Sequence, residues 1–226
     1  METAEMNQSE IRAELATAYA AGVLDPALTL LVHAQTVVAA PGARILGLVE
    51  ATAGAMLEAE TPAPLSPDAL ERVLAKIDAG PDEIAAAANA LTQDENLMRE
   101  LSLLPAALQD AAIRSLARRK WTRPLRGLHV LELDVGSFGG KAELIRVAPG
   151  MDIPRHTHGG PEYTLVLAGS FRDEGDSYGI GDICFADPQV THTPKAEPGP
   201  TCWNLAVTYG ALKWRDYLGL ARRVLN

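Results

Sequence analysis

The sequence predicts an α+β protein in which a helical N-terminal half precedes an antiparallel β-barrel of the jelly-roll type. The first half is rich in Ala and Leu and carries helix start and stop signals at regular places. After Trp121, short alternating apolar runs are separated by turns rich in Gly, Pro and Asp. Short strands about 8 to 12 residues apart are typical of an antiparallel sandwich or barrel. With 226 residues, 47% of them hydrophobic, the chain can bury the core of one large domain or two small ones.

Local capping signals predict three helices near the N-terminus. Asn7 and Glu10 have the spacing of a capping box, in which each side chain bonds the backbone of the other. Asp25 and Pro26 supply an N-cap and a proline in the first turn of the next helix. A Pro-Gly pair at 41–42 is expected to break the chain before a third helix. The three predicted helices span 11–21, 27–38 and 43–58.

A proline-rich segment and a second set of signals predict further helices. Residues 61–65 (TPAPL) contain two prolines, which prevent a continuous helix and indicate a linker. A helix should then start at 66–68 (SPD) and end at 80–81 (GP). Its apolar residues have the spacing of one buried face; they are Leu70, Val73, Leu74 and Ile77. Two more helices are expected at about 82–91 and 105–118.

The alternating runs in the second half predict five principal strands, at 128–133, 142–147, 163–167, 182–186 and 202–207. Together with the helices they divide the chain into three parts. These are a helical domain over 1–80, a helical connector over 81–122 and the barrel domain over 123–226.

Charge and targeting signals narrow the function classes. Lys and Arg total 20 against 29 Asp and Glu, and the net charge of -9 makes the chain a poor partner for nucleic acid. The basic residues between 118 and 126 are interpreted as the solvated end of a helix and its linker. The N-terminus has no basic segment followed by an apolar run. The apolar run 27–40 is shorter than the about 20 residues that a membrane span needs. We therefore expect a cytoplasmic protein that binds neither nucleic acid nor membrane.

One constellation of residues predicts a metal site. His156 and His158 are two residues apart, so on a strand their side chains leave the same face. After a Gly-Gly-Pro turn, Glu162 begins the next run, and His192 is the candidate fourth ligand from a non-adjacent strand. Imidazole and carboxylate ligands suit zinc, iron, manganese or nickel. A single buried histidine is more often a hydrogen-bonded core residue, but three of the five histidines lie here beside a glutamate. We predict one divalent metal ion at these four residues.

The same residues resemble a known superfamily. The spacing G-x5-H-x-H-x3-E-x6-G over 150–169 matches the first motif of the cupins at every position. The second cupin motif is present more loosely in Gly181, Pro188 and His192, without the usual glycine between the proline and the histidine. Ala196 stands where many cupins have asparagine. The resemblance implies a cupin, or RmlC-like jelly-roll, fold for the barrel.

A longer stretch resembles ChrR-type zinc-dependent anti-sigma factors. It runs H-T-H-GGPEYTLVLAGSFRDEGDSYGIGD, is followed by THTP, and is preceded by LATAYAAGVLDPALTLLVHAQ in the helical half. The resemblance implies a small helical domain that binds an extracytoplasmic-function sigma factor, followed by a metal-binding cupin. The cupin zinc ligands of the family fall on His156, His158, Glu162 and His192.

The resemblance also implies that a second zinc site has been lost. The family's H-x3-C-x2-C run falls on Gln35, Ala39 and Gly42, none of which binds zinc as His or Cys would. A structural zinc contributes folding free energy to a small helical domain. We therefore expect apolar packing by Val37, Val38 and Ala39 to replace it.

Three functions remain open on the sequence. The first is a regulator whose cupin senses a signal and whose helices bind a sigma factor. The second is a metal-dependent cupin enzyme, such as a dioxygenase, acting on a small molecule. The third is a module that binds an organic ligand in the barrel and uses its helices to form a homodimer. Zinc held by four protein ligands has no open coordination position, which favours the regulator. No catalytic residue is assigned.

Two sets of residues have competing interpretations. Apolar residues of the first helices either contact the sigma factor or form an intramolecular core, and the core is favoured; they are Leu15, Tyr19, Leu24 and Leu31. Cys184 and Cys202 are either redox-active thiols or small buried apolar residues, and burial is favoured.

Overall fold

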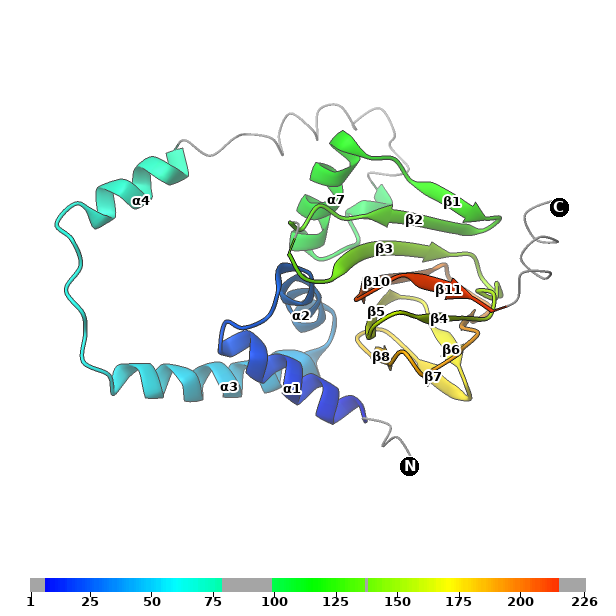
Figure 1. Ribbon diagram of the computed structural model, residues 1–226, viewed down its shortest axis with the longest axis horizontal. Coiled ribbons are helices and arrows are strands. Elements are labelled where there is room, and N and C mark those ends of the chain that lie inside the picture. Colours follow the sequence, from blue (N-terminus) through cyan, green and yellow to red (C-terminus); the bar gives the residue numbers. More distant parts are fainter. Residues whose placement is uncertain (1–6, 79–98, 137, 216–226) are drawn as a thin grey trace.

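The computed structural model describes residues 7–78, 99–136 and 138–215 (Figure 1). Helices precede an antiparallel β-barrel, which confirms the predicted α+β class. Their bounds are Gln8–Ala20 (α1), Pro26–Val38 (α2), Ala40–Glu58 (α3), Ala69–Asp78 (α4) and Ala106–Arg118 (α7). The helix expected at 82–91 lies outside the described residues.

The caps predicted at Asn7 and Asp25 are confirmed, although α1 begins at Gln8 rather than at residue 11 and α2 at Pro26 rather than at residue 27. Asn7 accepts hydrogen bonds from the backbone N–H groups of Ser9 and Glu10, and Glu10 bonds back to the N–H of Asn7. Asp25 caps α2 with Pro26 in the first turn. The predicted break at 41–42 is wrong by two residues, because the chain is extended at Ala39 and α3 already starts at Ala40. A proline needs no N–H partner in the first turn of a helix, so Pro41 fits inside α3.

The barrel is built from one large and two small antiparallel sheets. The large sheet has six strands in the order β1-β2-β3-β10-β5-β8, the second pairs β11 with β4, and the third has the order β7-β6-β9. The strand bounds are Thr122–Leu125 (β1), Leu128–Glu132 (β2), Lys141–Val147 (β3), His156–His158 (β4), Glu162–Ala168 (β5), Phe171–Asp173 (β6), Asp176–Tyr178 (β7), Ile183–Ala186 (β8), Lys195–Ala196 (β9), Cys202–Thr208 (β10) and Leu212–Trp214 (β11). All five predicted strands are present.

The six-stranded sheet separates two apolar clusters. The outer cluster packs Leu131, Leu144 and Leu205 of the sheet against α1, α2 and α7, and these three leucines are fully buried. The inner cluster contains Val147, Val166 and Cys202, among others, and lies inside the barrel. Along each strand, alternate side chains therefore point toward the helices or into the barrel interior.

The first two helices dock on β8 through specific polar contacts as well as apolar packing. Gln8 exchanges two hydrogen bonds with the backbone of Ile183, at 2.6 and 3.0 Å. Arg12 Nη2 lies 2.8 Å from Asp182 Oδ1 and 3.2 Å from the carbonyl oxygen of Gly181. Gln35 Nε2 donates to the same carbonyl oxygen at 3.1 Å. The helical half and the barrel are thus joined at the turn that leads into β8.

The segment that resembles the lost zinc motif forms part of this junction. Gln35 is 3% exposed, and a side chain at Gly42 would meet its amide. Gly181 has a positive φ of 84°, and Ala39 fills the space where its side chain would be. The expected replacement by valine packing is wrong for Val37, which is 64% exposed, whereas Val38 does pack against the outer cluster. The buried amide of Gln35, between the helices and the barrel, occupies this region instead.

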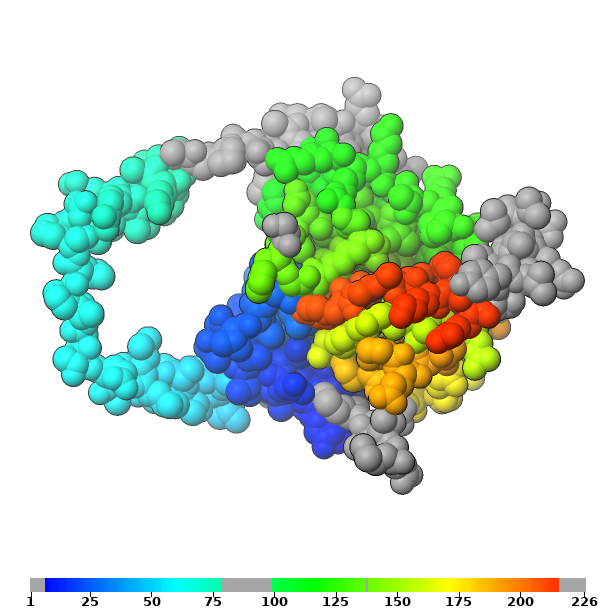
Figure 2. Space-filling model, in the orientation of Figure 1, coloured from blue at the N-terminus to red at the C-terminus, as the bar shows by residue number. Residues whose placement is uncertain are grey.

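Helix α4 departs from the predicted pattern. The four apolar residues at helical spacing were expected to be buried, but α4 has no buried residue. Leu70, Val73, Leu74 and Ile77 are between 49% and 68% exposed. Helix α4 lies apart from the barrel at the end of an extended segment after α3 (Figures 1 and 2).

The apolar residues of α1 and α2 belong to the core, as the favoured interpretation states. Leu15 and Leu31 are buried in the outer cluster, and Tyr19 and Leu24 pack against it. No single helix among the described residues is both long and apolar enough to cross a membrane. Helices α2 and α3 meet those criteria only as a pair, and they are bent by 118° relative to each other.

Candidate metal centre

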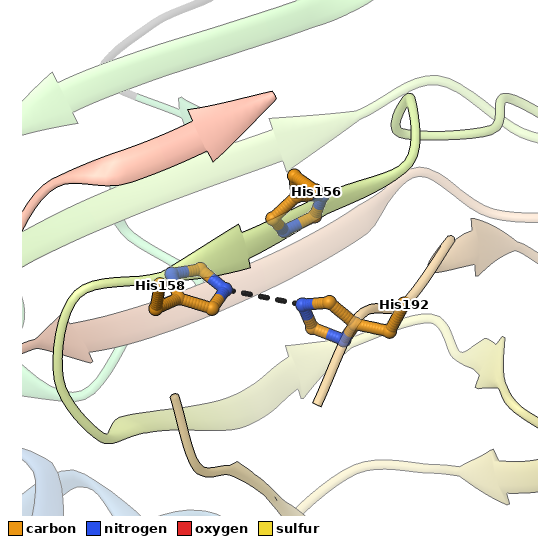
Figure 3. A group of neighbouring side chains, drawn as sticks. All are labelled: His156, His158 and His192. Atoms are coloured by element: carbon orange, nitrogen blue, oxygen red, sulfur yellow. Dashed lines mark hydrogen bonds between the residues drawn. The ribbon is translucent and has the colours of Figure 1, made fainter. Parts of the chain in front are cut away.

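Three histidines from two parts of the chain converge inside the barrel (Figure 3). His156 and His158 come from β4, and His192 is held beside them because its backbone pairs with that of His156. All three side chains are buried, at 4%, 2% and 1% exposure. Nε2 of His158 lies 3.1 Å from Nε2 of His192, and one ligand atom from each of the three lies within 4.8 Å of the others. The structure thus brings together the three predicted histidines.

Two of the three imidazoles are hydrogen-bonded to an oxygen at Nδ1, whereas Nδ1 of His158 has no hydrogen-bond partner among the described residues. Nδ1 of His156 bonds the carbonyl oxygen of Pro154 at 2.8 Å, and Nδ1 of His192 bonds Asp173. Nδ1 of His158 lies 3.5 Å from a carboxylate oxygen of Glu162. An oxygen at Nδ1 fixes the ring orientation and favours the tautomer with a free Nε2 lone pair. Among the described residues, these three histidines form the group of potential ligand side chains that lie close enough together to hold a metal ion.

Glu162 lies beside the three histidines rather than among their converging atoms. It begins β5 in the six-stranded sheet and accepts a hydrogen bond of 3.1 Å from Thr164. Burial raises the pKa of its carboxyl group to about 7. From this position the Glu162 carboxylate can either face the His158 ring or rotate toward a metal ion. The role of Glu162 as a ligand therefore stays a prediction.

Burial also prepares the imidazoles for metal binding. Desolvation, followed by the neighbouring His192, lowers the pKa of His156 to about 4. Desolvation and the other two histidines lower the pKa of His158 to about 4. Both rings are therefore neutral near pH 7, and a neutral imidazole is the form that donates a lone pair to a metal. These two neutral imidazoles, with the ring of His192 beside them, fit a borderline divalent cation such as zinc, iron, manganese or nickel.

Asp173 is the site residue that the sequence reasoning missed. It ends β6, a strand that is not among the five predicted ones, and it is 7% exposed. Phe171 and Asp173 are both buried while Arg172 between them is exposed. This alternation was the available signal, since an acidic residue on the inward face of a strand needs a buried partner. His192 is that partner.

The two cysteines behave as buried apolar residues. Both are free and buried, and both line the barrel interior. Desolvation raises the thiol pKa of Cys184 to about 12 and that of Cys202 to about 11. A raised pKa keeps a thiol protonated and unreactive. Tyr163 lies on the outward face of β5, where its ring is tilted against that of Phe185 with centroids 4.9 Å apart, and it does not line the cavity.

The interior of the barrel around these residues encloses a cavity of about 360 Å³. The three histidines, Glu162 and Asp173 line part of it. Inward-facing apolar residues of β2 and β3, with Ile153 and Phe171, line another part. The metal centre therefore opens onto space inside the barrel.

Comparison with known proteins places this architecture in a family. Residues 109–213 match the ChrR cupin-like domain. The chain is 35% identical over 204 residues to the anti-sigma-E factor ChrR of Cereibacter sphaeroides, which covers 90% of this chain and 91% of that protein. The fold is similar to the crystal structure of Rhodobacter sphaeroides SigE in complex with the anti-sigma ChrR. That match has a TM-score of 0.65 and 33% identity, and it covers 87% of this chain and 96% of the matched chain. The chain therefore belongs to the ChrR family of anti-sigma factors and carries the cupin-like domain of that family.

Proposed function

We propose that this protein holds an extracytoplasmic-function sigma factor inactive through its helical half, and that its zinc-loaded cupin senses the signal for release. The observation that carries the proposal is the similarity, over 87% of the chain, to a structure solved as a complex of an anti-sigma factor with its sigma factor. The role is regulatory and non-enzymatic, and the protein acts in the cytoplasm. The family favours this role over a dioxygenase.

Exposed apolar residues of α4 supply a surface for the sigma factor. Leu70, Val73, Leu74 and Ile77 lie three and four residues apart, so they form one stripe along the helix. We call these four residues the α4 stripe. An exposed apolar stripe on a helix is typical of a helix that docks in a groove of a partner. The stripe thus fits a protein partner better than it fits the chain's own core.

Zinc bound by His156, His158, His192 and Glu162 would complete the cupin. Three nitrogen donors and one carboxylate are a ligand set that zinc accepts in tetrahedral geometry. Four protein ligands leave no open coordination position, and such closed sites have structural or sensing roles. The fixed Nδ1 partners, Pro154 and Asp173 among them, support a site whose ligands are already oriented.

Strand β8 links this site to the helices. Cys184 in β8 points to the inside of the barrel, where its Sγ lies 3.9 Å from Asp173 Oδ2. The preceding residues face the helical half, since Ile183 bonds Gln8 and Asp182 pairs with Arg12. A shift of Asp173 when the metal site changes would therefore act on the strand that holds α1. This gives the sensor a physical route to the helical half.

The test is a pull-down with the tagged full-length protein from cells of the organism that encodes it, followed by mass spectrometry. We expect one extracytoplasmic-function sigma factor to be enriched. The purified protein should then inhibit transcription that depends on this sigma factor, and chelation of the metal should change that inhibition. Absence of any sigma factor above an untagged control would contradict the proposal. Inhibition that is indifferent to metal would limit the protein to sigma binding without sensing.

A further inference from the structure

The inward face of the six-stranded sheet is packed less tightly than its outward face. Leu131 and Leu144, which point outward, are 0% exposed. Their neighbours Val130 and Ile145, which line the cavity, remain only half-buried. Protein interiors are normally packed as densely as organic crystals, so an apolar cavity of this size inside a barrel leaves room for a bound molecule. A cavity of about 360 Å³ lies within the size range of small-molecule sites.

One polar side chain in this apolar floor has only weak partners. Asn204 of β10 lies directly across from Ile145 of β3, is 5% exposed and lines the cavity. The side-chain amide of Asn204 contacts the Sγ atom of Cys202, with Nδ2 at 3.4 Å and Oδ1 at 3.6 Å. A thiol is a weak donor and a weak acceptor, whereas an amide offers two N–H donors and a carbonyl oxygen. Asn204 therefore has hydrogen-bonding capacity to spare toward the cavity.

The charges around the cavity select the kind of molecule that fits. Among the described lining residues, the cation is Lys141, and its ammonium group already contacts Glu132 at 3.2 Å and Glu143 at 2.7 Å. The carboxyl groups of Glu162 and Asp173 lie on the histidine side. With zinc bound, the two positive charges of the ion are balanced by the carboxylates of Glu162 and Asp173, so an anion brought into this buried space would lose its hydration without gaining a net positive partner. A neutral molecule avoids that cost.

From this arrangement we infer that the barrel binds a neutral, largely apolar small molecule through one oxygen atom that accepts a hydrogen bond from Asn204. Its hydrocarbon part lies over Val130, Ile145 and Phe171. The inference deepens the proposed sensing role and rests on it for biological meaning, since the ligand occupies the space next to the metal centre. Binding itself depends on Asn204 and the apolar floor.

A matched pair of probes tests the ligand class on the full-length, zinc-loaded protein. 2-Heptanone and hexanoate carry the same hydrocarbon chain but differ in charge, and saturation-transfer NMR detects even weak binding. We expect 2-heptanone to bind at least about tenfold more tightly than hexanoate. Each additional methylene in the ketone series should strengthen binding by about fourfold until the cavity is full, because burying one CH₂ contributes about 0.8 kcal/mol.

Two variants and one control test the location. Ile145→Phe fills the cavity and Asn204→Leu removes the hydrogen bond, and each should weaken binding of 2-heptanone by about tenfold or more. Leu103→Phe adds the same ring at a position that is 82% exposed and should leave binding unchanged. Thermal melts and zinc content identify a variant that fails to fold. If Ile145→Phe fails to fold, Asn204→Leu still tests the location of the site.

Equal binding of ketone and carboxylate, or unchanged ketone binding in both cavity variants, would overturn the inference. Sigma-factor binding is measured on the same preparations. If the sigma factor binds and no ketone does, the ligand site is refuted while the anti-sigma function stands. If the ketone binds and the sigma factor does not, the anti-sigma function is refuted while the ligand site stands.

Discussion

Variants of the α4 stripe should lose affinity for the sigma factor without losing folding stability. We consider the double variant Leu70→Ala with Ile77→Ala. The two side chains are 68% and 67% exposed, so their truncation should change the free energy of unfolding by less than about 0.5 kcal/mol. Alanine also has the higher helix propensity, so α4 is kept. The helix remains, and only its apolar surface is reduced.

The expected loss of sigma binding follows from the exposed area. Complete burial of a Leu or Ile side chain contributes about 1.5 to 3 kcal/mol, and about two-thirds of each is free to be buried by a partner. The double variant should therefore lose about 2 to 4 kcal/mol, which is a reduction of roughly 30-fold to 900-fold in affinity.

Isothermal titration calorimetry with the sigma factor recovered in the pull-down measures this loss. The matched control is Glu71→Ala with Lys76→Ala, which changes two residues of α4 outside the stripe. We expect the control to bind within about threefold of the wild type. Wild-type affinity in the stripe variant, with melting curves unchanged, would refute the assignment of α4 as a sigma-binding surface. Equal losses in both variants would show that the helix as a whole matters rather than its stripe.

Three further predictions concern the metal centre and the domain junction. Asp173→Asn should reduce zinc affinity by about 10- to 100-fold in a chelator competition, because it weakens the partner of His192, whereas Glu174→Gln should not. If Glu162 is a ligand, its carboxyl group must lose a proton before it binds. With a pKa of about 7, zinc affinity should fall by about tenfold per pH unit below pH 7, and Glu162→Gln should abolish that slope. A flat wild-type profile down to pH 5 would remove Glu162 from the ligand set. Arg12→Met keeps the stem of the side chain but removes its charge-assisted bond to Asp182, and urea unfolding should show a loss of about 2 kcal/mol.

The parts of the fold that follow from local interactions could be predicted from the sequence. Capping by Asn7 and Asp25 involves groups two or three residues apart, so the starts of α1 and α2 follow from the residues alone. Alternation along a strand has a period of two, so His156 and His158 had to leave the same face once β4 formed. His192 is too distant along the chain for local reasoning to place it, and it was predicted as a ligand from a non-adjacent strand, with support from the second cupin motif.

Other parts depend on where distant segments meet. The fate of α4 is one case, since its apolar spacing predicts a buried face but does not say whether that face packs within the chain or on a partner. Glu162 is another, because its position behind His158 depends on how the six-stranded sheet lies against β4. The division of the chain at 80 and 122 stays a prediction.

What the sequence by itself determined is the α+β order of the chain, the helix starts, the principal strands and the three histidines. Each of these depends on residues close together in the chain or on a spacing that a family shares. Only the tertiary structure decided that Asp173 backs His192, that Gln8 meets Ile183 across 175 residues of sequence, and that Asn204 faces open apolar space. Such contacts result from packing the sheet between two apolar clusters, and no local pattern encodes which residues end up opposite each other.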